Sequence, residues 1–260
     1  MNRKPIFLTQ LNNPTVAHDP APDEHASLRR AFESLVGALH AAYRQRHGGA
    51  ATPDDCIALS ALLEEFLTFI AQSDAEHGAD APLPLADGDI ACADALRACA
   101  ALEGWLNRLD LAACQNDLDT VILGISLWAM RHDCALRVPE PMVNALARLA
   151  NRAATRQDVA AAFALMQGAI EHLKPLLAAD LEQSNPDRPW RVLHLNFAIT
   201  GIRSGDGLLA GHAFSALNAG LPHEREGFYA EALHLARQSR LPDEMTALIQ
   251  AQHEASVGRH

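Results

Sequence analysis

The chain has 260 residues and a formal net charge of −11, because 32 Asp and Glu outnumber 21 Lys and Arg. This acidic balance argues against nucleic acid and anionic membrane surfaces as partners, since both attract clustered Lys and Arg. Ala and Leu supply 86 residues, whereas Val, Ile and Thr together supply 26. Because β-branched residues lose side-chain freedom in helices, this composition predicts an all-α protein with one large domain or two small ones.

The first half of the chain predicts an extended arm followed by helices. Residues 1–22 contain four prolines and few periodic apolar positions, so we expect them to form the arm. A first helix begins near Ser27 and ends before residues 48–49. It has one apolar stripe at three- and four-residue spacing, made of Leu28, Phe32, Leu35, Leu39 and Tyr43. A second helix begins at residues 52–55, Thr-Pro-Asp-Asp, where Thr can cap it and the acids favour its positive end. A linker at 79–88 and a helix at 89–109 complete a predicted N-terminal helical subdomain, residues 23–110.

The rest of the chain, residues 111–260, is predicted to form a helical-repeat subdomain. A helix at about 116–134 comes first, and the segment 139–141, Pro-Glu-Pro, opens the next. Thr155 and Asp158 then resemble a capping box, and Pro175 should kink or end the helix that they start. Four shorter helices follow, separated by turns at 205–207, 220–222 and 241–243. We therefore expect about ten helices in stacked antiparallel hairpins, and no β-hairpin.

The segment 194–222 has the residue pattern of a helical hairpin repeat. Small Ala198 lies in its first helix, Asp206 in its turn, and Ala210 and Phe214 in its second helix, with Pro222 as terminator. This segment resembles a tetratricopeptide repeat, and looser matches near 146–169 and 228–254 extend the resemblance over about 140–255. The aligned turn residues Asp158, Asp206 and Asp243 are 48 and 37 residues apart rather than a constant 34, and Gly201 stands where the family usually has a large aromatic. A tetratricopeptide-like α-solenoid and an irregular helical bundle both remain open.

Local motifs for catalysis or metal binding are incomplete. Glu231 and His234 form one Glu-x-x-His pair, but a di-iron bundle needs a second pair and two further Glu. Cys92 and Cys99 lie two turns apart on one helix face and are expected to be packing residues. Trp128 is expected to pack in the core, and Trp190 is expected to pack in the core or to staple its helix to a neighbour, with a role as an anchor for a partner as the alternative. No nucleophile with its base and no phosphate-binding loop is found, so no catalytic residue, metal or cofactor is predicted.

The sequence favours a cytoplasmic protein. The N-terminus has an apolar run of only three residues, too short for a signal peptide, and no stretch of about 20 apolar residues predicts a membrane span. The five cysteines are an odd number without a Cys-x-x-Cys motif, which is typical of reduced thiols. They are Cys56, Cys92, Cys99, Cys114 and Cys134.

If the resemblance holds, the first helix of each hairpin lines a groove, and polar side chains there hold a partner's backbone or carboxylate. The resemblance nominates Asn144, Arg148, Asn151, Asn196, Arg203, Tyr229 and Arg240. The sequence thus predicts a non-catalytic interaction module, a scaffold, adaptor or chaperone-like protein that binds a protein or peptide segment. The alternative is a helical bundle that binds a small ligand, or an enzyme, with a buried pocket between the two halves.

Overall fold

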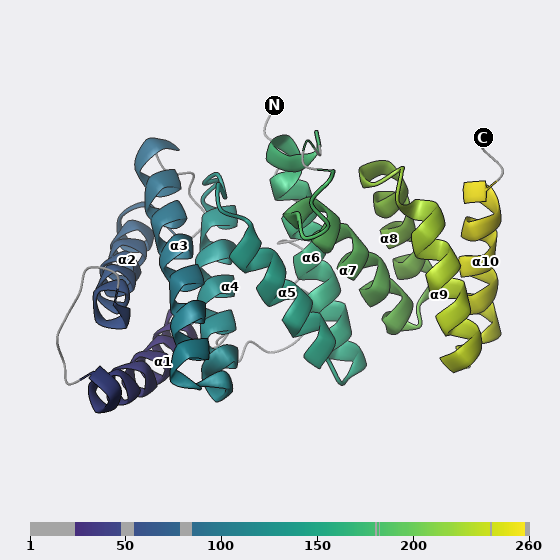
Figure 1. Ribbon diagram of the computed structural model, residues 1–260. Helices are drawn as coiled ribbons and strands as arrows, with labels where there is room; N and C mark the ends of the chain where they lie inside the picture. Colours follow the sequence, from purple (N-terminus) through teal and green to yellow (C-terminus); the bar gives the residue numbers. More distant parts are fainter. Residues whose placement is uncertain are drawn as a thin grey trace, which may run out of the picture. The chain divides into compact units, whose positions relative to one another are not determined.

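The computed structural model describes residues 24–47, 55–78, 85–179, 181, 183–239 and 241–257. These residues form ten α-helices and one 3-10 helix and contain no strand, which confirms the predicted all-α fold (Figure 1). The predicted arm, residues 1–22, lies outside the described residues. The helices are α1 (Glu24–His47), α2 (Cys56–His77), α3 (Leu85–Leu109), η1 (Ala112–Cys114), α4 (Gln115–Arg131), α5 (Glu140–Arg152), α6 (Arg156–Leu177), α7 (Pro189–Ser204), α8 (Gly207–Gly220), α9 (Arg225–Ser239) and α10 (Asp243–Val257).

The chain divides into two compact units between Ala145 and Leu146, inside α5. The N-terminal unit contains α1 to α4 and the first turns of α5, and the C-terminal unit contains the rest of α5 and α6 to α10. The sequence prediction drew its division between residues 110 and 111. In the structure α4 packs on α1 and α3, so it belongs with the N-terminal helices.

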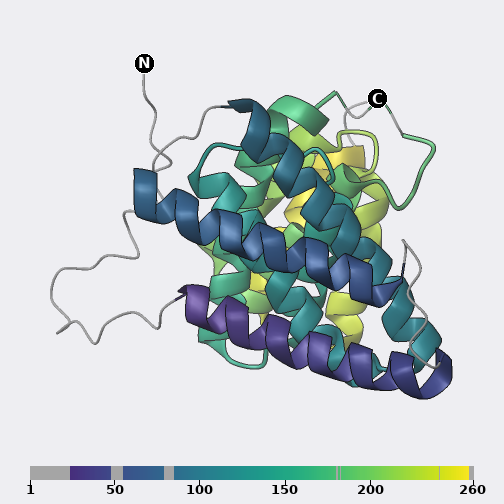
Figure 2. The same cartoon turned by 90° about the vertical axis from the view of Figure 1, so that its left-hand side faces the viewer.

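The N-terminal unit is built on mutual packing of α1, α2, α3 and α4. In Figure 2, α1 (purple) and α2 (dark blue) lie side by side and face the viewer. The apolar stripe predicted for α1 is buried along its whole length, from Leu28 to Tyr43. α2 begins after Asp55, whose carboxylate accepts hydrogen bonds from the backbone N–H groups of Ile57 and Ala58. Gly124 of α4 lies directly against Leu28, so these two helices approach closely.

By length and composition α2 could cross a membrane, which the sequence analysis did not anticipate. The helix has two different sides in the structure. Leu63, Phe66 and Ile70 are buried, while Glu64 and Glu65 are exposed. This division is what packing against α1 and α3 produces.

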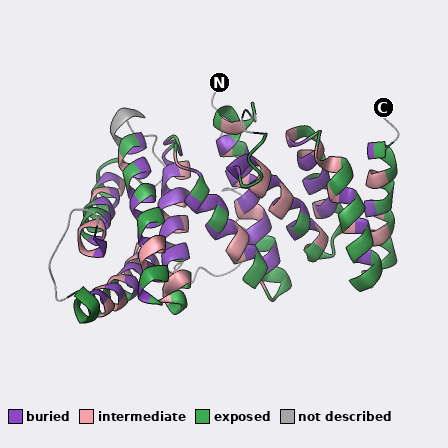
Figure 3. Ribbon diagram, viewed as in Figure 1, coloured by how far each residue is buried: buried purple, intermediate pink, exposed green. Residues whose placement is uncertain are grey.

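The C-terminal unit is a series of helices in which chain neighbours pack together. α6 packs on α7, α7 on α8, and α9 on α10, and α8 also contacts α10. Figure 3 shows that the helices carry buried and exposed sides. The predicted capping box is present, since Thr155 Oγ1 accepts from the Asp158 N–H while the Asp158 carboxylate accepts from the Thr155 N–H. α6 ends two residues after Pro175, as predicted.

Small residues set the crossing of α7 and α8. A Cβ at Gly201 would lie 3.0 Å from the Ala213 Cβ and 3.1 Å from the Ala210 Cα. The position where the repeat family usually has a large aromatic therefore has no room for one here. The turn between the helices contains Gly205 in the left-handed region, at φ 69°, and Asp206 then caps α8.

Candidate functional site

The three residues predicted on the first groove helix all lie on one side of α5. Asn144, Arg148 and Asn151 follow at four- and three-residue spacing, with Asn144 and Asn151 exposed and Arg148 half-buried. The division between the two units falls between Asn144 and Arg148.

The two residues predicted on α7 use their polar groups inside the C-terminal unit. The Asn196 side-chain amide donates to the Val192 carbonyl one turn earlier, at 2.8 Å. The Arg203 guanidinium donates to the carbonyls of Ala150 and Ala153, where α5 ends. Cationic groups commonly satisfy the last carbonyls of a helix in this way. Arg203 therefore ties α7 to the end of α5, rather than standing ready for a partner's carboxylate.

Tyr229 belongs to the core and not to a surface. Its side chain is 0% exposed, its ring packs edge-on against Phe214, and its hydroxyl lies 3.0 Å from the Asn218 side-chain oxygen. Burial raises the pKa of this phenol. Arg240, the last predicted groove residue, lies outside the described residues. Of the described predicted residues, Arg203 and Tyr229 thus use their polar groups within the C-terminal unit.

The first helices of two hairpins, α7 and α9, instead expose apolar side chains. Val192, Leu195, Ile199 and Ile202 form one stripe along α7, which we call the α7 stripe. Ile199 is 42% exposed and the other three are half-buried. On α9, Phe228 and Ala232 are half-buried and Leu235 is 50% exposed. Sequence reasoning missed these residues because apolar periodicity on a helix is ordinarily assigned to the core.

A second cluster, in the N-terminal unit, is centred on the carboxylate of Asp74. His25 Nε2 and His132 Nε2 each lie 2.7 Å from an Asp74 oxygen, and Trp128 Nε1 donates to it at 2.8 Å. The His132 and Trp128 rings pack in a tilted arrangement, with centroids 4.4 Å apart. Burial alone would raise the pKa of Asp74, but the hydrogen bonds from Trp128, His25 and His132 outweigh it and lower the pKa. Asp74 is therefore an ionised acceptor held by α1 and α4.

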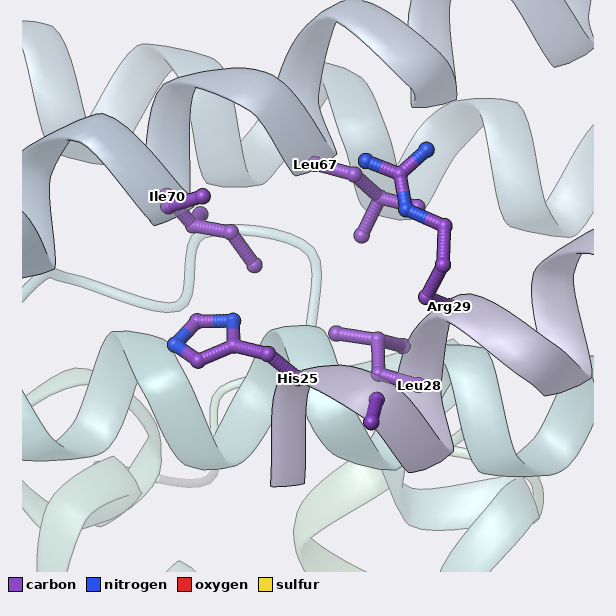
Figure 4. A pocket seen from close by; sticks show the side chains of 7 residues that line it. His25, Leu28, Arg29, Leu67 and Ile70 are labelled. Carbon is purple, nitrogen blue, oxygen red and sulfur yellow. The ribbon is translucent and has the colours of Figure 1, made fainter. Parts of the chain in front are cut away.

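A cavity of about 250 Å³ opens beside this cluster, between α1 and α2. Figure 4 shows His25 and Arg29 on the same side of α1, facing α2. The wall is otherwise apolar. The lining residues are His25, Ala26, Leu28, Arg29, Leu67, Ile70 and Ala71. The volume lies just below the roughly 300–1,000 Å³ typical of drug-sized pockets, so the cavity suits a smaller molecule.

The other chemical candidates of the sequence form no site within the part of the chain that the structure describes. No group of three or more His, Cys, Asp or Glu is arranged to hold a metal ion there. His234 contacts Gln238 rather than a second Glu-x-x-His pair. Cys99 is buried, and Cys92 lies against the Cys134 thiol, which helps to raise its pKa.

No family model matches the chain, and no curated protein or solved structure matches it.

Proposed function

We propose that the protein is a non-catalytic interaction module that binds an amphipathic helix of a partner protein along the α7 stripe. The C-terminal unit would act as a degenerate tetratricopeptide-like scaffold, and the protein would work in the cytoplasm as an adaptor or chaperone-like factor. The observation that carries the proposal is the apolar surface that the α7 stripe leaves partly open to solvent.

The spacing of the α7 stripe suits a helical partner. Its four residues are three, four and three positions apart, so they lie on one face, in the pattern that receives the apolar seam of a second helix. The opposite face of α7 is already used, because Leu193 and Phe197 are buried there. A helix that is apolar on both faces is expected where a second partner covers the outer face.

The close α7–α8 crossing at Gly201 and the sequential packing of the unit support a rigid scaffold, which keeps a docking surface preformed. Asn151, in the part of α5 that belongs to this unit, is exposed and is a candidate for a polar contact with the partner's backbone. All five cysteines are free thiols, which supports a reducing compartment.

The test is affinity capture from the native cell extract with wild-type protein, Ile199→Glu and Leu208→Glu. Ile199 is in the α7 stripe, whereas Leu208 is an isolated apolar residue on α8 with 86% of its side chain exposed. A charge buried in a docking surface costs several kcal/mol of binding free energy. We therefore expect one protein to be captured by wild type and by Leu208→Glu, and the captured amount to fall at least about tenfold with Ile199→Glu. Its purified binding segment should gain helix content in the complex. Equal capture by the three proteins, or equal loss with both variants, would contradict the proposal.

The alternative from the sequence was a small-ligand protein or enzyme with a pocket between its two halves. The cavity found here lies within the N-terminal unit, between α1 and α2. Its chemistry is independent of the α7 stripe.

A further inference from the structure

We infer that the cavity between α1 and α2 is a binding site for a small, neutral, mainly apolar molecule. This molecule has one hydroxyl or N–H group, which donates a hydrogen bond to His25 Nδ1. The inference goes beyond the interaction module, because it concerns a different unit and a different class of ligand.

The first step is the protonation pattern of the Asp74 cluster. An ionised carboxylate only accepts hydrogen bonds, so each group that approaches Asp74 within 2.8 Å must donate. His25 therefore carries its proton on Nε2. In a neutral imidazole the other nitrogen is then an acceptor, so Nδ1 of His25 has a lone pair. The carboxylate fixes both the tautomer and the orientation of the ring.

The second step is the surroundings of that lone pair. His25 lines the cavity, and no described residue donates a hydrogen bond to its Nδ1. Figure 4 shows the ring projecting from α1 towards Ile70 of α2. The remaining wall, from Leu28, Leu67 and Ile70, offers only hydrocarbon. One acceptor in an apolar wall is complementary to an apolar body with one donor, because burying that body releases water and the donor keeps a hydrogen bond.

The third step is the charge. Among the described residues that line the cavity, Arg29 is the cationic side chain, and its guanidinium is already paired with Glu64. The nearest fixed charge beside His25 is the Asp74 carboxylate. An anionic ligand would be repelled by the Asp74 carboxylate and by the lone pair on Nδ1, whereas a neutral ligand with a hydrogen-bond donor is repelled by neither. The volume of about 250 Å³ accommodates a single ring such as a phenol.

The probes that test the site are phenol, anisole and benzoate, titrated calorimetrically into the full-length protein at about pH 8. Phenol and anisole share the ring and oxygen, but only phenol can donate, and benzoate tests an anion. We expect phenol to bind at least about tenfold more tightly than either. The imidazole nitrogens, followed by nuclear magnetic resonance, should show the His25 proton on Nε2, and Nδ1 should shift when phenol is added.

Two variants and one matched control locate the binding. His25→Phe keeps an aromatic ring without the acceptor and should abolish the preference for phenol over anisole. Ala71→Leu leaves His25 and Asp74 intact but fills part of the cavity, so it should weaken phenol and anisole alike. His77→Phe changes a histidine at the end of α2 that is outside the cavity lining, and it should bind as wild type does. Equal affinity for phenol and anisole, tighter binding of benzoate, unchanged phenol binding by His25→Phe, or no saturable binding of any probe would each overturn the inference.

Discussion

The carboxylate of Asp74 accepts hydrogen bonds from side chains of α1, of α4 and of the residue that follows α4. His25 belongs to α1 and Trp128 to α4, while His132 directly follows α4 and is fully buried. Removing a buried acceptor leaves several donors unsatisfied, which costs more than a typical surface contact. Asp74 therefore links the cavity that His25 lines to the core that Trp128 fills.

The acid sensitivity of the fold should depend on Asp74. Its folded pKa lies below the ordinary value of about 3.9, so its stabilising contribution is fully present above about pH 4 and is lost as pH falls through the folded pKa. We expect Asp74→Asn to lower the free energy of unfolding by about 1–3 kcal/mol at pH 7. The difference from wild type should shrink between pH 4 and pH 2.5. Urea unfolding at a series of pH values measures it.

The control for this experiment is Asp94→Asn, because Asp94 pairs with Arg97 on the exposed side of α3. An exposed pair contributes little, so this variant should stay within about 0.5 kcal/mol of wild type. A difference between Asp74→Asn and wild type that is the same at pH 7 and pH 2.5 would show that the charge of Asp74 is not the source of its contribution.

At the scale of an element, α8 contains two glycines in opposite situations. A Cβ at Gly220 would overlap the ring of His194, which is buried and bonded through Nδ1 to the Trp190 carbonyl. Trp190 in turn donates to the Gly220 carbonyl at 3.2 Å, so the end of α8 and the start of α7 are locked together. Gly211 on the same helix has open space around its Cα.

Replacing each glycine by alanine should therefore have opposite effects. Gly220→Ala forces the His194 ring out of its place and should destabilise by about 1–3 kcal/mol. Gly211→Ala removes only the conformational freedom of glycine and should stabilise by up to about 1 kcal/mol. Thermal and urea unfolding of both variants shows whether each substitution raises or lowers the free energy of unfolding. A neutral or stabilising Gly220→Ala would mean that His194 can move without cost.

Elements were more predictable than the contacts between them. The stripe of α1, the capping box at Thr155 and the end of α6 near Pro175 follow from local spacing and local chemistry, and the structure contains all three. Arg203 shows the limit. The sequence identified an arginine at the end of a helix, but it could not say that the carbonyls of α5 would meet it first. The repeat resemblance nominated Tyr229 for the groove, but an aligned position does not show which neighbours cover the side chain, and Tyr229 is buried.

The Asp74 cluster escaped the sequence for a related reason. His25 is 49 residues and His132 is 58 residues away from Asp74 in the sequence. Local motifs pair only residues within a few helical turns. Only the tertiary packing of α2 on its neighbours brings Asp74 to His25 and His132.

At the scale of the whole molecule, the dominant property is the surplus of eleven negative charges over 260 residues. Like charges on a folded chain repel one another, and unfolding separates them, so the surplus destabilises the compact state. Salt screens this repulsion, with a screening length of about 30 Å at 0.01 M and about 8 Å at 0.15 M. Ion pairs work in the opposite direction, both on the surface, as for Arg97 with Asp94, and with a buried arginine, as for Arg188 with Glu224.

The free energy of unfolding should therefore rise with salt at pH 7.5, by about 1 kcal/mol or less between 0.01 and 0.2 M sodium chloride, the order of one or two screened surface pairs. The same comparison near pH 5.6, the isoelectric point of the sequence, is the internal control. There the net charge of the sequence is near zero and the net repulsion vanishes, so salt should have no effect or should slightly destabilise by screening the remaining attractive pairs. Urea unfolding followed by circular dichroism at both pH values gives the four free energies. Destabilisation by salt at pH 7.5 would mean that local ion pairs, rather than the acidic surplus, dominate the electrostatic energy of the folded chain.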